Sequence, residues 1–170
     1  MKFKSLLVLT LFLLFSTLTA VAQQNSDITT FVLVRHAEKI DDSTDPDLTP
    51  QGYQRAERLA EMLQNIPFDA VYSSERIRTR ETVRKIADQN GVEILSYEPH
   101  EPAEEVERLL HSNLGKTVLV SGHSNTTPFF ANELLDREHF EDKFDESDYG
   151  NLLIITIDGD GESKLLHLRY

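Results

Sequence analysis

Three short apolar runs in this 170-residue sequence are each followed by side chains able to bind or attack an anion. Runs of this length that are rich in β-branched and aromatic residues predict buried strands. Residues 31–34 lead into Arg35 and His36, residues 70–72 lead towards Ser74 and Arg78, and residues 117–120 lead into His123 and Ser124. Ligands of open α/β sheets bind at the carboxyl ends of the strands, so we expect these side chains to meet at one sheet edge.

Together these residue types suit a phosphoryl group. A neutral imidazole, here that of His36, can attack phosphorus, and the guanidinium groups of Arg35 and Arg78 can neutralise the phosphoryl oxygens. His123 would serve best in its charged form, so the two histidines predict a bell-shaped pH profile. Ser124 lies at a helix start whose free backbone N–H groups would add to the anion site. Each motif alone is also typical of a turn or a solvated helix face, so the prediction depends on finding all of them in one chain.

The segments between these runs predict the scaffold. Helical patterns with start or stop signals cover residues 50–65, 76–89, 103–114 and 127–135, with Met62 and Ile77 expected to face inward. Further strands are expected at 92–97 and in a terminal hairpin of residues 152–157 and 164–168, whereas residues 136–148 are acidic and expected to be irregular. This alternation predicts a three-layer α/β/α fold, with a mostly parallel sheet, helices on both faces and a C-terminal β-hairpin.

Residues 1–22 have the composition of a secretory signal peptide. Lys2 and Lys4 precede an apolar stretch over 6–18, and Ala20-Val21-Ala22 supplies a small-x-small cleavage pattern. We therefore expect cleavage after Ala22 and a periplasmic or secreted mature protein. An uncleaved N-terminal anchor is the alternative.

The mature chain, residues 23–170, is expected to be a single acidic domain. The formal charge of the whole chain is −12, and it becomes −14 without Lys2 and Lys4. Such a surface repels nucleic acid and anionic membranes, so neither is expected as a partner. The sequence contains no cysteine and no evident spacing of metal ligands, so we predict neither a disulfide nor a metal or other cofactor.

The motifs, in their order along the chain, resemble those of the histidine phosphatase superfamily, which has the phosphoglycerate-mutase-like fold, in its small branch that includes phosphohistidine phosphatases. Arg35-His36-Ala37-Glu38 resembles the family's Arg-His-Gly or Arg-His-Ala opening, and Leu48-Thr49-Pro50-Gln51-Gly52 resembles its Leu-Thr-x-x-Gly segment. The stretch from Ser74 to Thr82 resembles the segment that carries the family's second arginine, here Arg78, and Ser121-Gly122-His123-Ser124 resembles its second histidine motif. The resemblance covers essentially the whole mature chain.

The resemblance implies a metal-independent phosphatase in which His36 is the nucleophile and becomes phosphohistidine. Arg35, Arg78 and His123 would then hold the phosphoryl oxygens. The family's proton donor is usually an acidic residue in the loop after the third strand. Glu98 directly follows that strand and is our choice, with Glu101 and Asp47 as alternatives.

We therefore expect an exported phosphomonoesterase, monomeric, that acts on small-molecule or glycan phosphomonoesters through a phosphohistidine on His36. Two alternatives keep the same site: a catalytically weak domain that binds phosphorylated ligands, and a protein phosphohistidine phosphatase. A third gives the acidic segment 136–148 a role in binding a basic partner or cations. The remaining histidines, His100, His111, His139 and His167, are expected to be ordinary surface or core residues.

Overall fold

The computed structural model describes residues 28–170, so the predicted signal peptide and the predicted start of the mature chain at Gln23 lie outside the described residues. Six strands form one sheet in the order β3-β2-β4-β1-β5-β6. The strands are β1 (Thr29–Arg35), β2 (Ala70–Ser73), β3 (Ile94–Ser96), β4 (Thr117–Gly122), β5 (Asn151–Ile157) and β6 (Ser163–Arg169). The helices are α2 (Pro50–Leu63), α3 (Ile77–Asn90), α4 (Pro102–Ser112) and α5 (Thr127–Leu135).

The sheet has a parallel part and an antiparallel part. Strands β3, β2, β4 and β1 run parallel, and the pairings of Arg35 with Gly122 and of Ser73 with Ser121 bring their carboxyl ends to one edge. Strand β5 runs antiparallel to β1, and β6 antiparallel to β5. The amino end of β5 therefore lies beside the carboxyl end of β1, where the predicted site begins.

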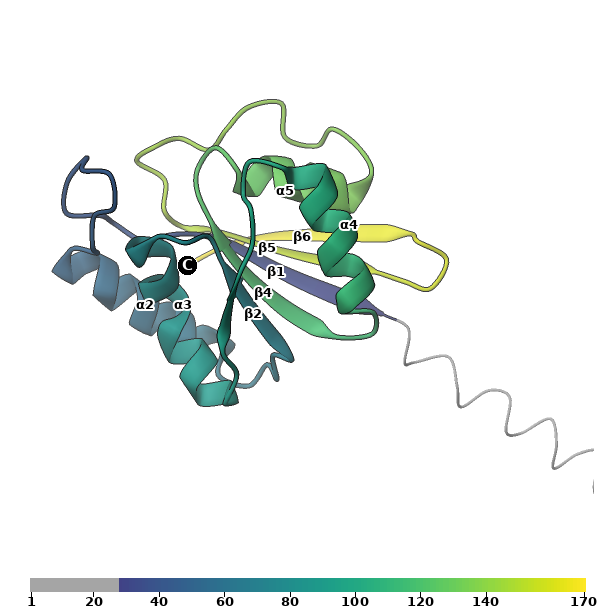
Figure 1. Cartoon of the computed structure of the whole chain (residues 1–170), viewed down its shortest axis with the longest axis horizontal. Helices are drawn as coiled ribbons and strands as arrows, with labels where there is room; N and C mark the ends of the chain where they lie inside the picture. The colour runs from purple at the N-terminus through teal and green to yellow at the C-terminus, as the bar shows by residue number, and fades with distance from the viewer. Residues whose placement is uncertain (1–27) are drawn as a thin grey trace, which may run out of the picture.

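Two helices cover each face of the sheet, with α2 and α3 on one side and α4 and α5 on the other (Figure 1). Side chains of β1 alternate between the two resulting apolar layers. Phe31 and Leu33 join the cluster with α4 and α5, and Val32 and Val34 join the cluster with α2 and α3. A strand buried on both faces is typical of a central parallel strand, and burial of each such side chain contributes about 1.5–3 kcal/mol. The predicted three-layer α/β/α fold with a C-terminal hairpin is confirmed.

Helix α2 begins where a close backbone approach fixes the loop after β1. The Thr49 hydroxyl accepts a hydrogen bond from the Gly52 amide at 2.9 Å, and Pro50 is the first helical residue, both ordinary start signals. A Cβ atom at Gly52 would lie 2.4 Å from the Glu38 carbonyl oxygen. Glycine at this position therefore lets the helix lie directly against the loop that follows His36.

Some details of the scaffold differ from the sequence prediction. Strand β3 covers only Ile94–Ser96, less than the predicted 92–97. Met62 and Ile77 are 50% and 45% exposed, not inward as predicted. In α3 the buried positions belong partly to Thr79 and Thr82, polar residues that a search for apolar periodicity passes over.

Residues 136–148 contain neither helix nor strand, as predicted. Among residues 28–170, none of the helices is both long enough and apolar enough to cross a membrane.

Candidate active site

The predicted site residues from three different strand ends lie together at the carboxyl edge of the sheet. His36 follows β1 and His123 follows β4, and their ring centroids are 5.4 Å apart. Arg78 comes from the first turn of α3. His36, Arg78, His123 and Ser124 all line one open hollow of about 320 Å³. The expectation that these side chains converge is met for this set.

His36 is held in the form that a nucleophile needs. Its Nδ1 atom lies 2.7 Å from the Ala37 carbonyl oxygen, which can only accept, so Nδ1 carries the proton and Nε2 keeps a free lone pair. The pKa of His36 is lowered to about 3, mainly by burial and also by the positive charges of Arg35 and Arg78, against the opposing effect of the Ala37 carbonyl. The imidazole is therefore neutral at physiological pH.

His123 is also neutral, which corrects the expectation of a charged side chain. Its Nε2 atom lies 2.9 Å from the Ser74 hydroxyl, and its Nδ1 atom lies 3.5 Å from Nη2 of Arg78. Because arginine can only donate, Nδ1 is the unprotonated atom and Nε2–H donates to Ser74. Burial lowers the pKa of His123 to about 3, with further effects from His36 and Arg78. The free site thus gives no support to a bell-shaped profile set by these two histidines.

Arg78 brings a mostly buried positive charge whose hydrogen bonds are incomplete. Its Nε and Nη1 atoms are buried and have no hydrogen-bond partner, and the Asp45 carboxylate approaches Nη1 only to 3.7 Å. Buried donors are nearly always paired, and an unpaired one costs free energy. Arg78 is therefore prepared to receive an anion in the hollow beside His36.

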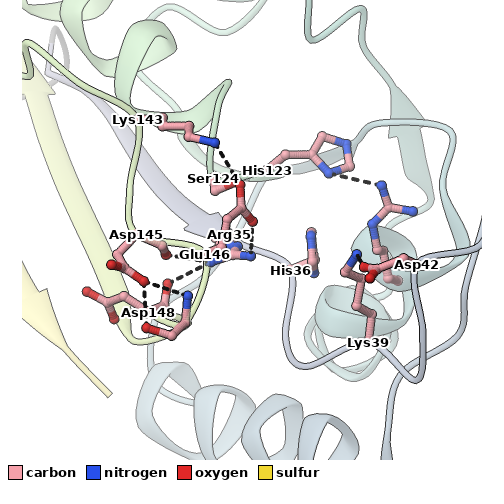
Figure 2. A network of polar contacts seen from close by, with 12 residues as sticks. Arg35, His36, Lys39, Asp42, His123, Ser124, Lys143, Asp145, Glu146 and Asp148 are labelled. Atoms are coloured by element: carbon pink, nitrogen blue, oxygen red, sulfur yellow. Dashed lines mark hydrogen bonds and ion pairs between the residues drawn. The ribbon is translucent and has the colours of Figure 1, made fainter.

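Arg35 lies on the other side of the site and is already occupied. Its side chain is 1% exposed. Nη1 donates to the carbonyl oxygens of Asp145 and Asp148 at 2.9 and 3.1 Å, and the guanidinium lies 4.1 Å from the centroid of the Tyr149 ring. Nη2 forms an ion pair with the Glu146 carboxylate at 2.9 Å (Figure 2). Only Nε lacks a hydrogen-bond partner.

The same carboxylate also holds Ser124, the other group predicted to bind phosphate. The Ser124 hydroxyl donates to Oε1 of Glu146 at 2.8 Å, and Nζ of Lys143 lies 3.3 Å from that oxygen (Figure 2). Partial burial raises the pKa of Glu146, but the Ser124 hydrogen bond and the Arg35 charge outweigh it and keep the pKa below its usual value. Glu146 is therefore ionised, and it was not singled out by the sequence analysis.

A signal for Glu146 does exist in the sequence, but it is indirect. Glu146 lies five residues before Asn151, the first residue of β5. Had β5 been predicted as the antiparallel neighbour of β1, the preceding residues would have been expected beside Arg35. The acidic segment itself has no periodicity from which such a contact can be inferred.

Hydroxyl groups on α3 support the two histidine-bearing loops. The Thr82 hydroxyl accepts from the Ala37 amide at 2.9 Å and donates to the Arg78 carbonyl at 2.7 Å. The Thr79 hydroxyl lies 3.0 Å from the Ser74 hydroxyl that holds His123. One helix thus orients both imidazoles and also supplies Arg78.

The three candidate proton donors lie in different surroundings. Glu98 is exposed and lines an adjoining hollow of about 540 Å³ together with Ser74 and His123, while its carboxylate accepts from the His100 amide at 3.1 Å. Asp47 accepts a hydrogen bond from the Tyr53 hydroxyl at 2.7 Å. Glu101 is exposed at the start of α4 and lines neither hollow. Glu98 stays the predicted donor.

The charged groups of the site are mostly cations. Among residues 28–170, no group of three or more histidine, aspartate and glutamate side chains is arranged to hold a metal ion.

The fold and the paired histidines can be compared with those of known proteins. Residues 31–100 match the model of the histidine phosphatase superfamily, branch 1. This is the superfamily whose motifs the sequence resembles, and the match covers a part of the chain that holds the first of those motifs. The matched residues include Arg35, His36 and Arg78.

Solved structures extend the similarity over most of the chain. A phosphoserine phosphatase mutant from Entamoeba histolytica, in complex with phosphoserine, is 22% identical with a TM-score of 0.64, covering 81% of this chain and 94% of that one. YhfR of Bacillus stearothermophilus is 20% identical with a TM-score of 0.67, covering 81% and 95%. The protein histidine phosphatase SixA, complexed with tungstate, is 16% identical with a TM-score of 0.64, covering 82% and 96%. No curated protein matched the chain by sequence.

Proposed function

We propose that this protein hydrolyses phosphomonoesters through a covalent phosphohistidine on His36. One observation carries the proposal: a neutral imidazole with a free Nε2 lone pair faces the same hollow as a guanidinium with two unpaired donors. A phosphoryl group placed there meets a nucleophile and the positive charge needed to stabilise its oxygens.

In the first half of the reaction, Nε2 of His36 forms a bond to phosphorus while the bond from phosphorus to the leaving oxygen breaks. The leaving oxygen takes a proton from an acid, for which Glu98 in the adjoining hollow is the candidate. In the second half, water attacks phosphorus while one of its protons passes to the Glu98 carboxylate, the P–N bond breaks and phosphate leaves. Nε2 regains its lone pair, so the imidazole is restored for the next cycle.

The leaving group would occupy the adjoining hollow, which His123, Arg76 and His100 join to the hollow beside His36. Its lining is polar and includes Glu75, Glu98 and Arg108, so a small polar alcohol or a sugar fits better than an apolar group. The phosphoserine complex of the Entamoeba protein is consistent with a small phosphorylated substrate. The function of SixA makes a phosphohistidine protein the second candidate.

The proposal includes export, a monomeric mature chain and activity without a metal ion. Export rests on the signal-peptide composition of residues 1–22 alone. N-terminal sequencing of the secreted protein tests cleavage after Ala22, and light scattering tests the oligomeric state. Neither nucleic acid nor a membrane surface is proposed as a partner, because the charge of the chain is strongly negative.

The test is turnover of an aryl phosphate by the mature chain in excess chelator, beside His36→Ala and the control His111→Ala. His111 is exposed on α4 and lines neither hollow. We expect the wild type and His111→Ala to be active, His36→Ala to be inactive, and denaturation in alkali, where the P–N bond is stable, to trap phosphohistidine in the two active proteins only. Activity that persists in His36→Ala would reject the nucleophile. Phosphate binding without any turnover would favour the alternative of a phospho-ligand-binding domain.

A further inference from the structure

The Glu146 carboxylate occupies the two groups that were predicted to bind phosphoryl oxygens. One of its oxygens is 2.9 Å from Nη2 of Arg35 and the other is 2.8 Å from the Ser124 hydroxyl. A hydroxyl has only one proton to donate, so Ser124 cannot serve the carboxylate and a phosphoryl oxygen at once. The Glu146 carboxylate likewise occupies Nη2 of Arg35, so this donor is not available to a phosphoryl oxygen either. Half of the expected anion site is therefore filled by the chain itself.

The two partners of this ion pair differ in their freedom to move. The Arg35 side chain is 1% exposed, whereas the Glu146 side chain is 59% exposed. The backbone around Glu146 is fixed from both sides, because the Asp145 and Asp148 carbonyls accept from Arg35 and the amide of the buried Phe144 donates to the Ser124 carbonyl at 2.9 Å. Rotation of the Glu146 side chain alone would free both donors, with no movement of the segment.

The charge around the hollow favours an incoming anion once Glu146 has turned away. Of the described residues that line the hollow beside His36, Glu146 is the only one with a carboxylate, and Lys39, Arg76, Arg78 and Lys143 are cations. Arg78, whose Nε and Nη1 have no hydrogen-bond partner, lines the same hollow. A phosphoryl group would thus replace one carboxylate and in addition lie beside a guanidinium whose hydrogen bonds are incomplete.

We propose that Glu146 is a built-in anion that holds half of the phosphate site and must turn away before phosphoryl oxygens reach Arg35 and Ser124. Glu146 thereby sets the affinity of the site for phosphate and for phosphomonoesters. This inference rests on the proposed function only in taking the hollow beside His36 as the phosphate site.

The expected effect follows from competition within one molecule. A site that is open for only a fraction of the time binds its ligand more weakly by that fraction. Hydrogen bonds to charged groups are strong enough to close the site for most of the time, so we expect Glu146 to weaken phosphate binding about tenfold. The same competition would speed the departure of product phosphate.

The first experiment compares inorganic phosphate binding by calorimetry in the wild type, Glu146→Gln and the matched control Glu141→Gln. Glu141 is exposed in the same segment and forms neither an ion pair with Arg35 nor a hydrogen bond with Ser124. We expect phosphate to bind about tenfold more tightly to Glu146→Gln and within about twofold of wild type to Glu141→Gln. An equal gain in both variants would indicate a general charge effect and overturn the proposal, as would no gain in Glu146→Gln.

A second variant separates contact from charge. Glu146→Asp keeps the negative charge but shortens the side chain by one methylene, so its carboxylate cannot span Arg35 and Ser124 as Glu146 does. We expect it to bind phosphate more tightly than the wild type. A crystal structure of the wild type with vanadate supplies the direct readout. Vanadate on Arg35 and Ser124 with Glu146 turned out supports the proposal, and vanadate bound with the ion pair intact, for example through Nε of Arg35, overturns it.

These measurements can reject the role of Glu146 without rejecting the proposed function, and the reverse. Phosphate binding needs no turnover, so an inactive protein whose Glu146→Gln variant binds phosphate more tightly would keep this inference and reject the phosphatase. An active protein with unchanged phosphate affinity in Glu146→Gln would do the reverse. In an active protein we expect KM to fall along with the dissociation constant of phosphate. A hundredfold loss of kcat with unchanged KM would assign proton donation to Glu146 and overturn the proposal.

Discussion

The two arginines of the site have opposite surroundings. Arg35 uses Nη1 and Nη2 on two carbonyl oxygens and a carboxylate and lies against an aromatic ring. Arg78 has two buried nitrogens without any hydrogen-bond partner. Arg35 therefore helps to hold the segment before β5 in place. Arg78 keeps donors without a partner, so its guanidinium can still bind a ligand. Two residues with the same predicted role thus differ in how much each contributes to stability and to binding.

The largest expected effect is loss of activity in Arg78→Met. Removing the guanidinium from the hollow should lower kcat/KM about 10²–10³-fold, the usual cost of a lost transition-state donor. Stability should hold or rise, because the buried unpaired donors disappear with the side chain. Steady-state kinetics and urea unfolding of the same preparation measure both quantities. If Arg78→Met lost as much stability as Arg35→Met, the proposed difference between the two arginines would be wrong.

Arg35→Met should lower the free energy of unfolding by about 2–3 kcal/mol, because two carbonyl oxygens and the Glu146 carboxylate lose a charged donor. The matched control is Arg84→Met, whose exposed ion pair with Glu81 is worth less than about 1 kcal/mol. Urea denaturation compares the two. If both variants are equally stable, Arg35 does not hold the segment.

Acid should destabilise the site through its histidines. Burial holds the pKa values of His36 and His123 at about 3 in the folded protein, against 6.5 for an exposed histidine. The unfolded chain therefore binds protons first, and stability falls as the pH drops from about 6.5 towards 3, by up to about 1.4 kcal/mol per pH unit for each group. His36→Asn combined with His123→Asn should flatten this slope. Urea midpoints at pH 7, 6, 5 and 4 give the dependence of stability on pH for both proteins. The same dependence in the wild type and the double variant would contradict the neutral state assigned to the two histidines.

The smallest effect is expected from the aromatic ring beside Arg35. Tyr149→Leu removes the cation–π contact but keeps an apolar side chain, so it should cost about 0.5–1 kcal/mol of stability. Thermal unfolding beside Phe129→Leu, at an aromatic residue of α5 that is 37% exposed, provides the comparison. A gain in stability in Tyr149→Leu would mean that the contact between the Tyr149 ring and Arg35 is unfavourable.

The sequence was most informative where the chain is locally regular. The apolar runs that end at Arg35, Ser73 and Gly122 predicted the strands, and their parallel arrangement brought His36, Arg78 and His123 together as expected. Local patterns settle these features because strand burial depends mainly on the residues of the strand itself.

What depends on tertiary contacts was not predicted. The neutral state of His123 follows from its burial and its Ser74 and Arg78 neighbours, none of which is visible in Gly122-His123-Ser124. Glu146 lies in a segment without periodicity and reaches Arg35 only because β5 runs antiparallel to β1. Ile77 was predicted inward from its apolar character, although the first turn of α3 leaves it exposed.

The antiparallel placement of β5 has a consequence for the order in which the chain becomes complete. The partners of Arg35 follow it by 110 to 113 residues, so this cation stays unneutralised until the last quarter of the chain has been made. Contacts of such separation form late in folding, because a long loop must close first. A chain ending before residue 146 should therefore present Arg35 without the carboxylate that competes for it. The competition between Glu146 and a ligand for Arg35 would then begin only when the final hairpin joins the sheet.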